Sequence, residues 1–251
     1  MSHESSSLHV AIFGASSGIA LPIARIYAGR QAHIYLVGRD REKLTEIEKD
    51  CLLRGAAKVH IITSDLGSAT HARAACEFLQ HRCQYLDVLI IAQGSLGTTE
   101  QLLQDSPSCE ALFNLNVQGP IAIGNAFIPF FRQKKSGTIA IFSSVAGDRG
   151  RASNFIYGAS KAAMTAYASG LRALLAPDGV HVLTIKPGMV ATAMTAHLPK
   201  SPLLADPEQV AKQVVGAIDK RKAVLYTPSF WRWIMLVVIH LPESLFMRLR
   251  F

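Results

Sequence analysis

Charged residues are scarce in this chain of 251 residues: they make up 18% of it, whereas hydrophobic residues make up 49%. Such a composition excludes a disordered protein, and the length suffices to bury a sizeable core. Cysteine is also scarce, and no C-x-x-C pair occurs among Cys51, Cys76, Cys83 and Cys109. This spacing favours neither a disulfide framework nor a zinc site, so we expect reduced, structural cysteines and no bound metal.

Targeting segments and domain linkers are lacking too. Residues 1–7 are short and polar, without the basic start and apolar run of a signal peptide, which predicts a cytoplasmic protein. No internal repeat, low-complexity tract or Gly/Ser/Pro-rich linker is found. The sequence therefore predicts a single domain over residues 1–251.

Negative charge is in short supply, because Lys and Arg number 26 against 18 Asp and Glu, a formal net charge of +8. This excess suggests an anionic partner, which could be nucleic acid, acidic lipid or a phosphorylated small molecule. The basic residues are dispersed and no nucleic-acid reader motif is present. We therefore predict no nucleic-acid partner.

Short apolar, β-branched runs alternate with longer amphipathic stretches along the chain. The runs that predict strands are residues 9–13, 33–37, 59–63, 88–91, 138–142, 181–185 and 224–227. The stretches that predict helices are residues 18–29, 41–54, 68–81, 107–132, 154–175 and 207–221. Strict alternation predicts an α/β protein with a Rossmann fold, a doubly wound, seven-stranded parallel sheet with helices on both faces.

One irregular stretch, residues 189–206, follows the sixth predicted strand and is rich in proline with its flanks. Ligands of open α/β sheets bind at the carboxyl ends of the strands, where such loops gather. We interpret this stretch as a lid over a substrate site rather than as a linker.

A segment of small residues follows the first strand and opens a helix: Gly14, Ala15, Ser16, Ser17, Gly18, Ile19 and Ala20. Small side chains there let backbone N–H groups approach a pyrophosphate at the helix N-terminus, which favours a dinucleotide site. The same segment matches G-x-S-x-G, so a serine hydrolase with Ser16 as nucleophile is the alternative. Its place on the first strand argues against a hydrolase, because the strands that usually precede a nucleophile elbow would be missing.

The second strand is followed by Gly38 and Arg39, without an acidic residue at the strand end, where an NAD enzyme holds the ribose hydroxyls. A guanidinium at that place suits a 2′-phosphate, although an arginine in a loop is often only a solvated charge. We therefore predict NADP(H) in preference to NAD.

Ser144 ends the fifth strand, and Tyr157 and Lys161 follow it, four residues apart on one face of a predicted helix. A lysine ammonium there lowers the proton affinity of the tyrosine. The phenol can then serve as general acid or base toward a substrate oxygen that Ser144 also binds. A Tyr-x-x-x-Lys pair is common by itself and becomes informative together with the glycine segment and the serine.

These motifs resemble those of the classical short-chain dehydrogenase/reductase family over about residues 9–227. The resemblance implies that the catalytic residues are Asn116, Ser144, Tyr157 and Lys161. It also implies that the cofactor is held by Gly14, Ser16, Ser17, Gly18, Ile19, Arg39, Asp65, Leu66, Ala92, Gln93, Gly94, Tyr157, Lys161, Pro187, Gly188, Val190 and Thr192. Asp65 and Leu66 match the adenine-binding pair of the family, and residues 187–192 match its nicotinamide-side loop.

In the roles that the resemblance implies, Tyr157 exchanges the proton, Ser144 polarises the carbonyl, and Asn116 positions a water. Lys161 lowers the pKa of Tyr157 and holds the nicotinamide ribose. The chain departs from the family pattern at Phe13, where Thr is usual, and at residues 91–94, where Ile-Ala-Gln-Gly replaces Asn-Asn-Ala-Gly. The family likeness further suggests a homodimer or homotetramer, paired through residues 107–132 and 154–175.

The last stretch, residues 229–251, is unusually apolar, but its run 230–241 is too short to span a bilayer, which needs roughly 20 apolar residues. Arg232, Arg248 and Arg250 join aromatic and aliphatic residues there, a pattern typical of a segment at a membrane surface. A helix packed beside the substrate cleft or in a subunit contact explains the pattern equally well.

This tail and residues 91–97 resemble the branch of the family that includes the decaprenylphosphoryl 2-keto-ribose reductases. That resemblance implies a keto-sugar on a polyprenyl phosphate as substrate, which suits an apolar tail with basic charge. The alternatives are a soluble ketoreductase of a small carbonyl, acyl thioester or steroid-like compound, and a nucleotide sensor without turnover. The complete catalytic set argues against a sensor and for an NADPH-dependent oxidoreductase that reduces a carbonyl to an alcohol or runs the reverse reaction.

Overall fold

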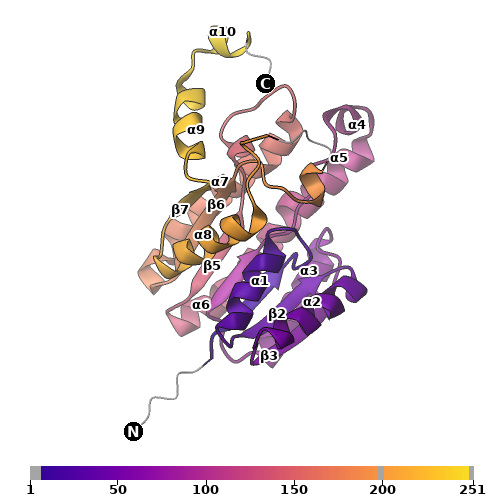
Figure 1. The fold of residues 1–251 in the computed structure, drawn as a ribbon, viewed down its shortest axis with the longest axis vertical. Coiled ribbons are helices and arrows are strands. Elements are labelled where there is room, and N and C mark those ends of the chain that lie inside the picture. The colour runs from indigo at the N-terminus through magenta and orange to yellow at the C-terminus, as the bar shows by residue number, and fades with distance from the viewer. Residues whose placement is uncertain (1–6, 197–200, 249–251) are drawn as a thin grey trace.

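The computed structural model of the protein describes residues 7–196 and 201–248. Residues 197–200 of the predicted lid, and residues 249–251 of the tail with Arg250, lie outside the described residues. Seven parallel strands form one sheet in the order β3-β2-β1-β4-β5-β6-β7 (Figure 1). They are β1 (His9–Phe13), β2 (His33–Gly38), β3 (Lys58–Thr63), β4 (Val88–Ile91), β5 (Thr138–Phe142), β6 (His181–Pro187) and β7 (Val224–Thr227). The predicted fold class is confirmed, and β6 continues beyond its predicted end at residue 185.

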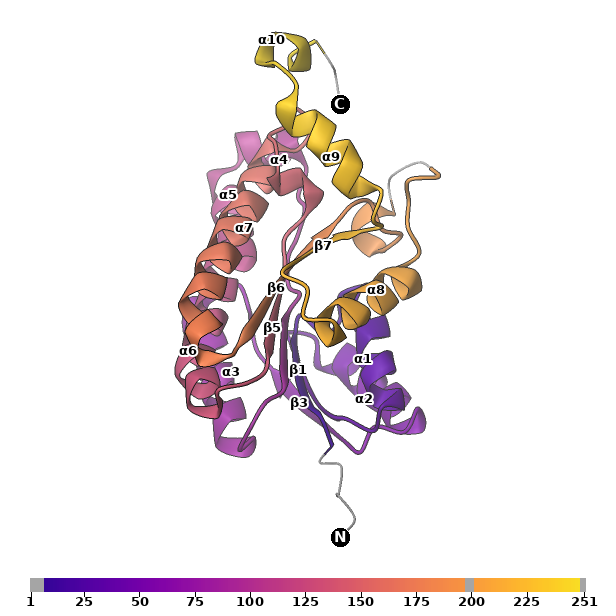
Figure 2. The same cartoon turned by 90° about the vertical axis from the view of Figure 1, so that its left-hand side faces the viewer.

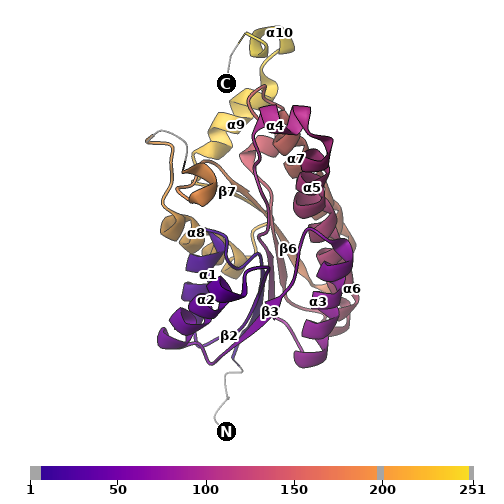
Figure 3. The same ribbon diagram turned by 90° about the vertical axis from the view of Figure 1, so that its right-hand side faces the viewer.

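Helices cover both faces of the sheet (Figures 2 and 3). One face carries α1 (Ala20–Gly29), α2 (Arg41–Leu53) and α8 (Pro207–Asp219). The other carries α3 (Ala69–Arg82), α6 (Gly119–Lys134) and α7 (Phe155–Leu175). Shorter helices are α4 (Thr99–Gln104), which the sequence analysis missed, α5 (Ser106–Phe113), α9 (Trp231–His240) and α10 (Glu243–Phe246).

The strands are apolar on both faces because each face of the sheet has its own core. In β1, Val10 and Ile12 are buried against α1 and α8, while Ala11 and Phe13 belong to the core on the other side. All four are fully buried. Phe13, where the family usually has Thr, packs edge to face on Phe127 of α6 with 6.2 Å between the ring centroids. The substitution thus serves the core under α6.

The predicted single helix over residues 107–132 is wrong in one respect: a π-helical turn, Asn114–Gln118, separates α5 from α6. This turn carries the buried Asn116, whose side-chain oxygen accepts a hydrogen bond from Ser95 N at 2.8 Å. Directly after it, the chain passes so close to Leu66 that a Cβ on Gly119 would lie 2.0 Å from the Leu66 carbonyl oxygen. Apolar periodicity does not locate a one-turn π-helix, so the sequence pattern could not predict this break.

Beyond β7 the chain forms α9 and α10, which stand at one end of the molecule (Figures 1 and 2). Only one side of α9 is packed: Trp231 and Met235 are buried against Val145, beside Met189 and Tyr226. Of the helices in the described ranges, none is long and apolar enough to cross a membrane.

Candidate active site

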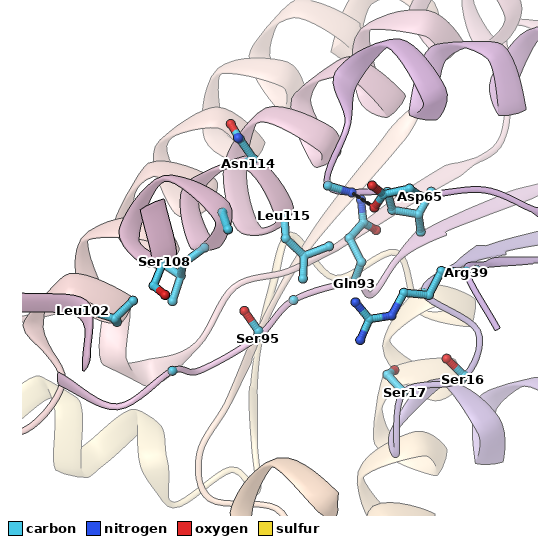
Figure 4. A pocket seen from close by; sticks show the side chains of 18 of the residues that line it. Ser16, Ser17, Arg39, Asp65, Gln93, Ser95, Leu102, Ser108, Asn114 and Leu115 are labelled. Atoms are coloured by element: carbon cyan, nitrogen blue, oxygen red, sulfur yellow. Dashed lines mark hydrogen bonds between the residues drawn. The ribbon is translucent and has the colours of Figure 1, made fainter. Parts of the chain in front are cut away.

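A cavity of about 640 Å³ opens at the carboxyl ends of the strands, where the strand order reverses between β1 and β4 (Figure 4). An open α/β sheet binds its ligands at such a switch point. Of the residues predicted to hold the cofactor, those that line this cavity are Gly14, Ser16, Ser17, Arg39, Asp65, Leu66, Gln93 and Gly94. Segments that follow four different strands thus meet in one site.

The glycine segment makes this convergence possible because it lets backbones approach one another closely. Gly14 has a φ of +81°, in the left-handed region that favours glycine, and a Cβ there would lie 2.5 Å from Gln93 N. A Cβ on Gly18 would lie 2.6 Å from Cγ2 of Thr192, so the loop after β6 meets the same segment. A larger residue at either position would separate the segments that line the cavity.

Arg39 and Asp40 follow β2, and their side chains have different surroundings. The Arg39 side chain is exposed and reaches into the cavity, between Gln93 on one side and Ser16 and Ser17 on the other (Figure 4). The Asp40 carboxylate instead caps α2, where it accepts a hydrogen bond from Lys43 N at 3.1 Å. The segment after β2 therefore offers the cavity a guanidinium rather than a carboxylate.

Gln93 brings an unpaired amide to the cavity. The residue is only 6% exposed, and both its Nε2 and its Oε1 are buried without a hydrogen-bond partner. Leaving such atoms unpaired costs about 1–3 kcal/mol each, so they indicate a ligand that donates and accepts hydrogen bonds there. The small, polar cradle and this orphaned amide both fit a nucleotide cofactor.

Ser144, Tyr157 and Lys161 lie close to one another and are not among the residues that line the cavity. The Lys161 ammonium donates to the Phe142 carbonyl oxygen at 3.1 Å and lies 5.8 Å from the centroid of the Tyr157 ring. Ser144 Oγ accepts from Ala146 N at 3.1 Å and donates to the Pro187 carbonyl oxygen at 3.4 Å. A Cβ on Gly94 would lie 3.2 Å from Lys161 Nζ, which places the Lys161 ammonium against Gly94 of the cavity lining.

Burial controls the proton affinities of this set. It raises the pKa of Tyr157 to about 12, and a hydrogen bond with Ser144 and the positive charge of Arg151 lower it in part. Burial also lowers the pKa of Lys161 to about 8. The positive charge of Arg151, a residue to which the family resemblance gives no role, thus acts on the phenol, and the effect of Lys161 on the pKa of Tyr157 stays a prediction.

Asn116 lies beside these residues with its amide fully engaged as a donor. Its Nδ2 donates to the Ser95 carbonyl oxygen at 2.9 Å and to Ser160 Oγ at 3.1 Å. Ser160 Oγ in turn donates to the Tyr157 carbonyl oxygen at 2.7 Å. The π-helical turn is thereby tied to the start of α7, whereas the water that we assign to Asn116 stays a prediction.

The loop after β6 connects the site to the tail. A Cβ on Gly188 would lie 1.9 Å from Trp231 Nε1, so the indole of α9 rests directly on the loop predicted to face the nicotinamide. The loop returns through a bridge between Val190 and Ala205, whose backbone groups bond at 2.9 Å to Met189 and Ala191. The two ends of residues 189–206 are thus joined by backbone hydrogen bonds. Whether this stretch covers a substrate stays a prediction.

Four residues near the site were missed by the sequence analysis: Arg149, Arg151, Asn154 and Trp231. Arg149 holds the tail, since its Nη1 donates to the carbonyl oxygens of Val238 and Leu241 at 2.6 Å. The others carry buried polar side-chain atoms without partners. The available sign was the pair of arginines between Ser144 and Tyr157, in a segment whose only other charged residue is Asp148.

The alternative assignment of Ser16 as a hydrolase nucleophile gains no support from these surroundings. Ser16 is exposed and lines the cavity, but no histidine of the described residues lines it with Ser16. A serine nucleophile needs an adjacent base to remove its proton. The residues around Ser16 fit the binding of a ligand.

Comparison with known proteins agrees with this geometry. The family model for short chain dehydrogenases matches residues 8–202, so the chain belongs to the short-chain dehydrogenase family. An uncharacterized oxidoreductase of Mycobacterium tuberculosis is 28% identical over 241 residues, 96% of each chain. Another, from Staphylococcus aureus, is 28% identical over 214 residues, 85% of this chain and 91% of that protein.

A solved structure extends the comparison to three dimensions. A short-chain dehydrogenase from Sphingobium yanoikuyae, in complex with NADPH, superposes with a TM-score of 0.80 at 26% identity. The match covers 97% of this chain and 96% of that one. The protein is therefore an oxidoreductase with the Rossmann-type fold of this family.

Proposed function

We propose that this protein is an NADPH-dependent carbonyl reductase in which Tyr157 exchanges the proton. The observation that supports the proposal is that Arg39 lines the cavity and that Lys161 and Asn116 lie against Gly94 of the same lining. Support for the cofactor comes from the similar Sphingobium yanoikuyae protein, whose structure contains NADPH.

In this proposal the cavity residues hold the cofactor along its length. Arg39 binds the 2′-phosphate, since Asp40, the acidic residue next to it after β2, is engaged as a helix cap. The remaining positions are those predicted from the sequence: the glycine segment for the pyrophosphate, Asp65 and Leu66 for the adenine, and Pro187, Gly188, Val190 and Thr192 on the nicotinamide side. When bound, the cofactor supplies the hydride that reduces the carbonyl carbon.

The catalytic residues act on the carbonyl oxygen. Ser144 Oγ donates a hydrogen bond that polarises the C=O bond, and Tyr157 transfers its phenolic proton to the oxygen as the hydride arrives at carbon. One hydride and one proton thus convert the carbonyl to an alcohol and leave NADP⁺. In the reverse direction the tyrosinate takes the alcohol proton, and the positive charges of Lys161 and Arg151 favour that anion.

Replacing Tyr157 with Phe tests the proposal. We expect carbonyl-dependent NADPH oxidation to fall about 100- to 10,000-fold, the range that general acid–base catalysis contributes. NADPH binding, followed by fluorescence titration, should survive because the ring and its packing remain. Undiminished turnover in Tyr157→Phe would refute the assigned role.

The substrate that we propose is a keto-sugar on a polyprenyl phosphate, on the basis of the branch resemblance in residues 91–97 and the tail. Similar proteins named only as uncharacterized oxidoreductases supply no substrate of their own. A small soluble ketone or acyl thioester is the second candidate. NADPH consumption with each class decides between them, because only a lipid-accepting site turns over the polyprenyl compound.

We further propose that the tail touches a membrane surface as a peripheral segment of a cytoplasmic enzyme. On the outer side of α9, Trp233 is 67% and Val237 62% exposed. The neighbouring Arg232 and Arg248 are basic, and the acidic Glu243 is paired with Arg149 at 2.7 Å. Exposed aromatic and aliphatic groups beside cations suit a bilayer of anionic lipid.

Flotation with phosphatidylglycerol vesicles tests this contact. We expect the wild type to float and the double variant Trp233→Glu/Val237→Glu to stay at the bottom of the gradient. Leu53→Glu is the matched control, since Leu53 is an exposed apolar residue of α2 away from the tail. Equal flotation of all three would remove the membrane proposal.

The assembly that we propose is a homodimer or homotetramer in which α6 and α7 pair across two-fold axes. These helices lie side by side, and Tyr167 of α7 donates a hydrogen bond to Asn125 of α6 at 2.9 Å. Sedimentation velocity tests the assembly, and a monomer at micromolar concentration would contradict it.

A further inference from the structure

The turn that leads into α7 contains two kinds of polar side chain. At its start, Asp148 pairs with the buried Lys186 at 2.5 Å and accepts from the Tyr226 hydroxyl at 2.8 Å. Arg149 is equally well satisfied, because the tail carbonyls and Glu243 accept its hydrogen bonds. This part of the turn is fixed by the protein itself.

Arg151 and Asn154 differ from these neighbours because each holds a buried polar atom without a partner. The atoms are Nε of Arg151, a donor, and Oδ1 of Asn154, an acceptor. Within residues 7–196 and 201–248, Arg151 forms no ion pair with a carboxylate. The two side chains come from one turn, since Asn154 N donates to the Arg151 carbonyl oxygen at 3.0 Å.

A helix cap or a solvated surface charge does not explain this pair. Asn154 occupies the N-cap position of α7, yet its side chain makes no capping hydrogen bond. An arginine on a surface keeps its guanidinium in water, whereas the Nε of Arg151 is buried, and burial lowers the pKa of this group. Buried polar groups are normally paired, so both atoms indicate a ligand.

The position of the pair indicates which ligand this is. The turn leads directly into α7, whose first turn carries Tyr157: Gly158 N donates to the Asn154 carbonyl oxygen at 2.8 Å. The charge of Arg151 also lowers the pKa of the phenol. A group that pairs with Arg151 therefore lies next to the place where the substrate oxygen receives its proton. A guanidinium selects an anionic oxygen, and the amide oxygen of Asn154 accepts a hydrogen bond from a hydroxyl.

We propose that Arg151 and Asn154 form a substrate subsite beside Tyr157, which binds an anionic group and a hydroxyl group of the carbonyl substrate. The inference rests on the proposed carbonyl reduction and adds a substrate class to it: hydroxylated ketones that carry a phosphate or a carboxylate. It also assigns specificity to two residues outside the predicted catalytic and cofactor sets.

Three small ketones that differ in charge test the subsite on the full-length enzyme with NADP⁺ bound. They are dihydroxyacetone, its phosphate and hydroxypyruvate, and their affinities are measured by calorimetry. We expect the wild type to bind at least one of the two anions about tenfold or more tightly than the neutral ketone, as a hydrogen bond to a charged group provides. Comparing the affinities for dihydroxyacetone phosphate and hydroxypyruvate shows whether the subsite prefers a phosphate or a carboxylate.

Substitutions test whether a preference for anionic ketones depends on Arg151 and Asn154. Arg151→Gln should reduce the preference for the anion to within about twofold, and Arg151→Lys should retain part of it. Asn154→Ala should weaken binding of the hydroxylated anions. Arg73→Gln, which removes a positive charge from an exposed position on α3, should keep the full preference. Thermal unfolding of each variant verifies that it is folded.

Two results would overturn the subsite: a wild type that binds the three ketones alike or binds none of them, and a preference that survives in Arg151→Gln. Failure of the proposed function looks different, because it is judged by NADPH oxidation and by Tyr157→Phe. A protein that reduces neutral ketones through Tyr157 without preferring anions retains the proposed function and lacks the subsite.

Discussion

The polar side chains at the two halves of the sheet differ in their surroundings: an open cavity around β1 to β4, and contacts between distant segments from β5 onward. Around β1 to β4, the polar side chains of an open cavity face a nucleotide-sized space, and the backbones of Gly14 and Gln93 meet. From β5 onward the site is buried and is held by contacts between distant segments, such as Arg149 with the tail and Trp231 on Gly188. The first half fits a nucleotide cofactor, and we propose that the second half binds the substrate.

Arg39 offers the largest expected effect on the cofactor half. Arg39→Ala removes the guanidinium that we assign to the 2′-phosphate, and a hydrogen bond to a charged group is worth about 1.5–3 kcal/mol. We expect NADPH affinity to fall roughly 10- to 150-fold, with little change for NADH, measured by fluorescence titration.

A matched control for this prediction is Arg41→Ala. Arg41 is also exposed, and it opens α2, but it does not line the cavity. Its loss should leave the preference for NADPH in place. An equal loss of NADPH affinity in both variants would assign the preference to general positive charge rather than to Arg39.

Gly188 provides a smaller test on the other half, where the tail meets the site. In Gly188→Ala the new Cβ would collide with the indole of Trp231. Overpacking of this kind typically costs about 1–3 kcal/mol, so we expect a lower melting temperature in calorimetry. Gly170→Ala on α7 is the control, because nothing lies within 4 Å of its Cβ and alanine favours a helix. A melting temperature for Gly188→Ala at or above that of the wild type would show that the indole does not rest on this loop.

The smallest expected effect is a shift in pH dependence when Arg151 is replaced. The positive charge of Arg151 favours the tyrosinate, so its removal in Arg151→Gln raises the pKa of Tyr157. Alcohol oxidation needs the tyrosinate, and its half-maximal rate should move to higher pH. A pH–rate profile that coincides with that of the wild type would show that Arg151 does not act on the phenol.

The cavity residues around β1 to β4 could be predicted from the sequence, whereas the contacts between distant segments from β5 onward were largely missed. All seven strands were predicted, because a strand buried on both faces is a local apolar run. The residues that line the cavity around Gly14 and Arg39 were predicted for a similar reason, since each directly follows a strand.

The missed features depend on contacts between segments far apart in the chain. The π-helical turn exists where Asn116 binds Ser95, and Trp231 matters because Gly188 leaves room for its indole. Arg149 and Arg151 stand two positions apart, yet one holds the tail and the charge of the other lowers the pKa of Tyr157. No local pattern distinguishes their tasks, because the partners lie elsewhere in the sequence.

We propose that the cavity and the set of Ser144, Tyr157 and Lys161 form one reductase site. The most direct measurement follows NADPH and NADH consumption by the wild type and by Tyr157→Phe across a panel of ketones that includes polyprenyl-phosphate keto-sugars. We predict that the wild type oxidises NADPH in preference to NADH, with one alcohol formed per cofactor, and that Tyr157→Phe is inactive. An absence of oxidation with every ketone, or equal rates for both proteins, would contradict the account.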